Sequence, residues 1–240
     1  MIIMAVKKNP YINAEPVLEK PAGTKQPRKR ILIICEGENT EVDYFKKFRI
    51  ANVTVTPIGI GMSTTKLIKE VEKYQKEIEK RKKIQFDEVW VVFDKDESSD
   101  FEDAIRLARS KKYKVAYSNQ AFEYWLVLHF QDHQGGAMQR SAYAAIINEN
   151  LQKQKYGVNY DAKSKHVSED MFDILMGLLQ KAYDRACKLY ALKKKTNQET
   201  QESVTTMHHL VKSITGIKTT EEQRKEEQKR QFIQNAKPKK

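Results

Sequence analysis

Short apolar runs alternate with amphipathic stretches over the first half of the chain. Four runs rich in β-branched residues predict buried strands, at 31–35, 53–58, 88–93 and 114–117. Apolar residues at helical spacing predict helices, at about 40–48, 64–83, 101–110 and 121–130. Strands that alternate with helices are typical of a parallel sheet with right-handed crossovers. We therefore predict an α/β fold with a four-stranded, mostly parallel, Rossmannoid sheet flanked by helices.

The pattern changes after Gly135-Gly136, where the strand-like runs stop. Three further helices are predicted, at 139–153, 168–194 and 203–214. Ser168 is a suitable N-cap for the longest of them. The chain is therefore expected to have two structured parts, an α/β domain over 30–135 and a helical C-terminal part over 136–217 packed on it.

The two ends of the chain differ from the rest in composition. Prolines interrupt residues 1–29, and residues 218–240 have almost no apolar positions, so we predict a flexible leader and a flexible tail. Both ends are basic and hold most of the excess behind the formal net charge of +12. Such ends either attract phosphates or only keep the protein dissolved, and charge alone does not separate these two interpretations.

Cysteine usage and hydrophobicity favour a cytoplasmic protein. The two cysteines, Cys35 and Cys187, form no CxxC pattern, which argues against a disulfide framework or a zinc ribbon. The longest apolar runs are far shorter than the roughly 20 residues of a membrane span. The apolar N-terminal stretch 1–6 is too short for a signal sequence. We expect no membrane association.

Acidic residues follow the first and the third predicted strand. Glu36 comes directly after 31–35, and Asp94 and Asp96 follow 88–93. Carboxyl ends of parallel strands meet at one edge of the sheet, so these side chains lie close together if the two strands are neighbours. Their repulsion then calls for a cation, and oxygen ligands suit Mg²⁺, with Mn²⁺ as a substitute. A metal there polarises a phosphoryl oxygen and lowers the pKa of a bound water.

Two further carboxylates are candidates for the same site. Glu41 lies in the first turn of the helix after Glu36, and it is either a second metal ligand or a residue favoured by the helix dipole. Glu123 begins the helix after the fourth strand and is expected to face the same sheet edge. The neighbouring Trp125 is interpreted as a core residue.

The remaining chemical signals are weaker. His208 and His209 are interpreted as core or helix-surface residues, with a base or phosphate contact as the alternative, and His129 is not expected to share a ligand role with Glu123. The chain has no GxxxxGK[ST] pattern, so ATP hydrolysis is not expected here. A receiver-like or phosphatase aspartate usually follows the first strand, whereas this DxD follows the third.

Several segments resemble the motifs of RloB-like proteins, also called AbiLii-type abortive-infection proteins. Cys35–Phe45 is similar to their CEGxxTExxYF opening, and Asp94-Lys95-Asp96 resembles their DxD motif. Ser118–Phe130 is similar to their SNPxFExWLLLHF segment, with Gln120 in place of the usual proline. Thr205–Val211 weakly resembles their C-terminal TxxHxLV element. The resemblance spans about residues 30–212.

The resemblance implies a Toprim-like fold, the catalytic module of several topoisomerases and primases. It implies that Glu36 is a metal ligand or general acid/base and that Asp94 and Asp96 bind Mg²⁺. It also implies a nuclease that acts on nucleic acid, DNA or RNA, in prokaryotic anti-phage defence by abortive infection. An AAA- or ABC-type ATPase is the implied partner.

A non-catalytic function is the alternative. In that case the protein is a regulatory subunit that docks on the ATPase through its helical C-terminal part. This hypothesis predicts co-purification with the ATPase and no Mg²⁺-dependent turnover. A homo-oligomer is a further alternative to a monomer.

Overall fold

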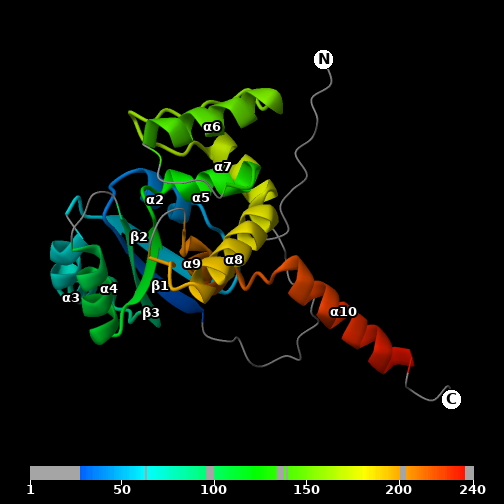
Figure 1. Ribbon diagram of the computed structural model, residues 1–240. Coiled ribbons are helices and arrows are strands. Elements are labelled where there is room, and N and C mark those ends of the chain that lie inside the picture. Colours follow the sequence, from blue (N-terminus) through cyan, green and yellow to red (C-terminus); the bar gives the residue numbers. More distant parts are fainter. Residues whose placement is uncertain are drawn as a thin grey trace.

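A four-stranded sheet lies at the centre of the protein (Figure 1). The computed structural model describes residues 28–62, 64–95, 100–133, 138, 140–200 and 204–235. The strands pair in the order β2-β1-β3-β4, and each of the three pairings is parallel. Their bounds are β1 (Lys29–Cys35), β2 (Val53–Gly59), β3 (Glu88–Asp94) and β4 (Lys114–Ser118). The predicted fold class, an α/β fold with a helical C-terminal part, is confirmed.

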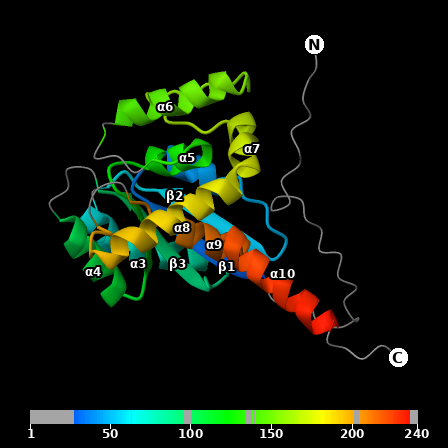
Figure 2. The same ribbon diagram turned by 45° about the vertical axis from the view of Figure 1, so that its right-hand side comes forward.

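Helices cover both faces of the sheet. In the described part of the chain their bounds are α2 (Thr40–Lys46), α3 (Thr64–Lys82), α4 (Phe101–Ser110), α5 (Glu123–Phe130), α6 (Arg140–Lys153), α7 (Glu169–Gly177), α8 (Leu179–Lys195), α9 (Met207–Thr215) and α10 (Thr220–Asn235). Helix α6 lies outside α5, farther from the sheet, in both views (Figures 1 and 2). In the residues described, no helix combines the length and the apolar character that crossing a bilayer requires.

Strand β1 divides the core because alternate side chains point to opposite faces. Ile31, Ile33 and Cys35 pack with residues of α2 and α5 to α9. Leu32 and Ile34 pack instead with residues of α3 and α4. All five side chains are fully buried, which explains why this strand has no polar position after Arg30.

The topology places a switch point between β1 and β3. From β1 the chain passes through α2, on one face, to β2 on one side of the sheet. From β3 it passes through α4, on the other face, to β4 on the opposite side. Ligands of open α/β sheets bind outside the carboxyl ends of the strands at such a point. The residues that follow β1 and end β3 therefore flank the expected site.

The helical C-terminal part differs from the prediction in one helix. Residues 168–194 were expected to be continuous, but the helix breaks at Leu178, which has φ −105° and ψ 1°. Gly177 immediately precedes the break. Glycine is a weak helix former, so interrupting the helix here loses less free energy than it would after a strong helix former. Leu175 and Leu179 are fully buried on either side of it. The predicted cap is confirmed, because the Ser168 side chain accepts a hydrogen bond from the backbone N–H of Met171 at 3.1 Å.

The segment expected to be a flexible tail forms helix α10, which extends away from the other elements (Figure 1). Its Glu, Gln, Lys and Arg residues are strong helix formers, and Glu221 pairs with Lys225 at i,i+4 spacing. Its first turn is tied to α8, where Asp184 accepts a hydrogen bond from the Thr220 N–H at 2.9 Å. Low hydrophobicity was therefore a poor guide to secondary structure here.

Glu88 joins three strands and α9 at the amino-terminal edge of the sheet. Its carboxylate lies 2.9 Å from Lys29 Nζ and 2.7 Å from Lys114 Nζ. Trp90 Nε1 donates to it at 2.8 Å, and Ser213 Oγ also donates to it. Burial raises the pKa of Glu88, but these hydrogen bonds outweigh burial and lower the pKa to about 2.

Replacing Glu88 with Gln should lower the free energy of unfolding at neutral pH by about 1–3 kcal/mol, because charge-assisted hydrogen bonds are lost. A free Glu has a pKa of about 4.3, so the contribution of Glu88 is complete above roughly pH 5 and is lost as the pH falls toward 2. Urea unfolding of both proteins between neutral and strongly acidic pH checks this. A difference that stayed constant over that range would contradict the prediction.

Candidate functional site

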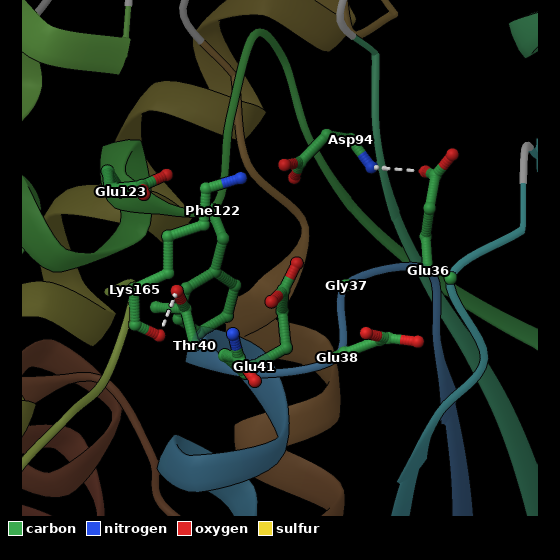
Figure 3. Close-up of a pocket in the computed structure, with 11 residues that line it drawn as sticks. Glu36, Gly37, Glu38, Thr40, Glu41, Asp94, Phe122, Glu123 and Lys165 are labelled. Atoms are coloured by element: carbon green, nitrogen blue, oxygen red, sulfur yellow. Dashed lines mark hydrogen bonds between the residues drawn. The ribbon is translucent and has the colours of Figure 1, made fainter. Parts of the chain in front are cut away.

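A cavity of about 400 Å³ opens at the carboxyl ends of β1 and β3 (Figure 3). Its lining comes from the loop after β1, the first turn of α2, the end of β3, the start of α5 and the loop between α6 and α7. The carboxylates that line it are Glu36, Glu38, Glu41, Asp94 and Glu123. The structure thus brings four of the five sequence-predicted site residues to one cavity at the switch point of the sheet.

Glu36 is positioned by the pairing of β1 with β3. Its backbone N–H donates to the Val92 carbonyl at 2.8 Å, which continues the ladder beyond Cys35. Its carboxylate accepts from the Asp94 N–H at 3.3 Å and from Thr64 Oγ1 at 3.5 Å. Glu36 is therefore held directly beside the end of β3, as expected for neighbouring strands.

Asp94 and Glu41 are buried carboxylates that share one space. Each is 6% exposed, and in Figure 3 both carboxyl groups point toward the same part of the cavity. Their charges also reach the Cys35 thiol: burial raises the pKa of Cys35, and the charges of Glu41 and Asp94 raise it further. Two negative charges this close are unfavourable unless a cation or a proton compensates them.

Two glycines leave space for the side chains of Glu38 and Glu41. A Cβ at Gly37 would lie 2.4 Å from a carboxylate oxygen of Glu41. A Cβ at Gly61 would lie 2.7 Å from a carboxylate oxygen of Glu38, and Gly61 also has a φ of 64° that favours glycine. The Glu38 carboxylate therefore lies close to Gly61. In Figure 3 it turns away from Glu41.

Glu123 lies at the deep side of the cavity. It is the first residue of α5 and only 1% exposed. Tyr160, from the loop between α6 and α7, donates its hydroxyl hydrogen bond to Glu123 Oε1 at 2.8 Å. Glu123 therefore links the start of α5 to a loop more than thirty residues later in the chain.

Two other acidic positions, Asp96 and Asp100, do not add to the described lining of the cavity. Asp96 and Glu97 lie outside the described residues, so the position of Asp96 stays a prediction. Asp100 precedes α4, but its side chain makes no capping hydrogen bond there and accepts instead from the Thr65 N–H at 3.3 Å. It therefore ties the start of α3 to the start of α4.

Of the three histidines considered in the sequence, His129 and His208 are buried, whereas His209 is exposed on α9, as expected for a helix surface. Trp125 is fully buried, as expected, and His129 beside it is fully buried too. Burial lowers the pKa of His129 to about 3, so its ring is neutral, with Nδ1 3.0 Å from the Trp125 carbonyl. His208 is 2% exposed, burial lowers its pKa, and its Nδ1 lies 3.1 Å from the Thr205 carbonyl. Both are core residues.

Sequence reasoning missed the residues that the loop between α6 and α7 contributes. Tyr160 contacts Glu123, and Lys165 lines the cavity. The loop is polar and contains glycine, a composition that predicts a connection and nothing more. These two side chains can be recognised as part of the site only from the folded structure, in which the loop packs against α2 and α5.

The donor set fits a hard divalent cation, because five of the cavity's eight polar side chains are carboxylates. Within the described residues, however, no group of three or more His, Cys, Asp or Glu side chains is arranged to hold a metal ion. The third ligand expected from sequence, Asp96, is not among those residues. The Mg²⁺ site therefore stays a prediction, with Glu36, Glu41 and Asp94 as its described candidates.

The fold and the cavity define an α/β protein with an acidic site at the switch point of a parallel sheet. The chain belongs to the RloB-like protein family, whose model matches residues 31–214. The match includes all the described carboxylates of the cavity and excludes α10. No curated protein matches the chain, and no solved structure does.

Proposed function

We propose that the protein is a Mg²⁺-dependent nuclease that cleaves a phosphodiester of DNA or RNA in a prokaryotic anti-phage, abortive-infection system. One observation carries the proposal: the Glu36 carboxylate, which follows β1, accepts a hydrogen bond from the backbone N–H of Asp94 on the neighbouring β3 at 3.3 Å, at the sheet edge where α/β proteins bind ligands. Family membership supports the defence role, since the resemblance implies it.

A divalent cation bound at this point supplies a polarised phosphoryl oxygen and a bound water of lowered pKa. Asp94 and Glu41 would hold it, because both are buried and point into the same space. Glu36 is more exposed and is fixed by two donors, so it is suited to accept the proton of the attacking water. Glu123 acts as a positioning residue through its hydrogen bond to Tyr160.

The test is cleavage of labelled single-stranded DNA, duplex DNA, tRNA and other RNA by the full chain, with and without its ATPase partner. We expect cleavage of at least one substrate with Mg²⁺ or Mn²⁺ and none in EDTA, because the carboxylates alone repel the phosphate. Undiminished cleavage in EDTA, or no cleavage of any substrate even with the ATPase present, would overturn the proposal.

Helix α10 favours the alternative function, a regulatory subunit that docks on an AAA- or ABC-type ATPase. Its described side chains are exposed, including Phe232 at 75% and Ile233 at 49% near its end. Apolar side chains at the end of a projecting helix suit contact with a partner. A stable complex with the ATPase that shows no Mg²⁺-dependent turnover on any substrate would favour this function over the nuclease.

A further inference from the structure

The loop between α6 and α7, residues 154–168, is fastened beside the acidic cavity at several points. Thr40 Oγ1 donates to the Lys165 carbonyl at 2.8 Å, and Asn39 Nδ2 donates to the Ser164 carbonyl at 3.4 Å. Further along, His166 Nδ1 lies 2.6 Å from Asp43 on α2. Together with the contact of Tyr160 to Glu123, these bonds hold the loop against the first turns of α2 and α5.

Within this loop, Lys165 has a constrained backbone. Its φ of 54° lies in the left-handed region, which is unfavourable for a residue with a Cβ. Its N–H donates to the Asp161 carbonyl at 2.9 Å, and its own carbonyl accepts from Thr40. Both backbone groups of Lys165 are therefore fixed, and the surrounding structure maintains an unfavourable conformation of the kind often found at functional sites.

The side chain of Lys165 enters the cavity. In Figure 3 it extends past Phe122 toward the space between Asp94 and Glu123. The described residues that line the cavity include five carboxylates and a single basic residue, Lys165. Lys163, two residues earlier in the same loop, is exposed and does not line the cavity. The loop thus offers one lysine inside the site and a natural control outside it.

Charge explains what a lysine would do there. The carboxylates repel a phosphate. A cation held among them would attract the phosphate, but only to the position of the cation. A fixed ammonium group across the cavity gives a second point of attraction and so sets where the phosphate lies. If Lys165 served only to neutralise carboxylates, its loss would change stability and leave phosphate binding unchanged.

We propose that Lys165 binds a backbone phosphate of the nucleic-acid substrate and that the loop over residues 154–168 is a substrate-binding element. The proposal rests on the nuclease function for its choice of ligand. It adds a residue that the motifs of the sequence did not indicate, and it assigns the phosphate-binding side of the cavity to the helical C-terminal part.

The test measures binding separately from cleavage. Fluorescence anisotropy of labelled single-stranded RNA and DNA is recorded with Asp94→Asn protein, so that substrate stays intact, over a series of salt concentrations. Lys165→Gly removes the amine and suits the left-handed backbone, Lys165→Arg keeps the charge, and Lys163→Gly is the matched control. We expect Lys165→Gly to weaken binding about 5- to 10-fold and to reduce the salt slope by roughly one. The other two variants should bind nearly as tightly as the parent.

Kinetics with otherwise wild-type protein give a second readout. Lys165→Gly should raise KM more than it lowers kcat, since the contact is made in the ground state as well. An unchanged Kd and salt slope in Lys165→Gly, or an equal loss in Lys163→Gly, would overturn the assignment. If the wild-type protein cleaves nothing but Lys165→Gly still weakens binding with a smaller salt slope, the nuclease proposal fails and the Lys165 proposal stands.

Discussion

Asp94→Asn is expected to reduce Mg²⁺-dependent cleavage at least about 100-fold while the protein stays folded. The substitution keeps the size of the side chain and the backbone N–H that binds Glu36. It removes the charge that would hold the proposed cation, and each tenfold loss in rate corresponds to about 1.4 kcal/mol of transition-state stabilisation. Initial rates at saturating Mg²⁺, with the substrate that wild-type protein cleaves, measure the effect.

Stability separates a chemical role of Asp94 from a structural one. Removing one carboxylate from a cluster of like charges should leave the melting temperature in EDTA unchanged or raise it. Asp103→Asn is the matched control, because Asp103 is exposed on α4 and lies outside the cavity. Glu36→Gln should be inactive in the same way. Wild-type rates in either cavity variant, or loss of activity accompanied by a large drop in melting temperature, would contradict the prediction.

The sheet and the pair Glu36–Asp94 could be predicted because their signals are local. β-branched runs define the strands, and the rule that parallel strands end at one edge then places the residues that follow them. The structure adds the neighbour relation that the sequence left open: β1 pairs with β3, with Cys35 opposite Val92. The interpretation of Trp125 as a core residue is confirmed for the same local reason.

Other parts of the site depend on contacts between distant segments, which no local pattern encodes. Lys165 lines the cavity and is held by a hydrogen bond to Thr40, and Tyr160 donates to Glu123; each partner is more than thirty residues away in the chain. Glu41 fits the helix-dipole interpretation by its position, while its role as a metal ligand stays a prediction. It lies in the first turn of α2, where the helix dipole favours it, and it also faces the cavity beside Asp94.

Gly59→Ala is expected to lower the free energy of unfolding by about 1–3 kcal/mol and to reduce cleavage at least tenfold. A Cβ at Gly59 would lie 2.5 Å from Glu38 Cα and 2.7 Å from the Gly37 carbonyl oxygen. Both are backbone atoms, so no side chain can rotate to make room. Either β2 or the loop after β1 must shift, and that loop carries Glu36 at the mouth of the cavity.

The hydrogen bonds around Gly59 explain why such a shift reaches the site. Ile60 N–H donates to the Cys35 carbonyl at 3.1 Å, and Gly61 N–H donates to the Glu36 carbonyl at 3.0 Å, so the end of β2 and the loop after β1 move together. Gly177→Ala is the control: nothing lies within 4 Å of its Cβ, and alanine at this helical position should stabilise by about 0.5–1 kcal/mol. Urea unfolding and initial rates of both variants provide the measurement. If Gly59→Ala were as stable and as active as wild type, the close approach of β2 to this loop would not position the acidic site.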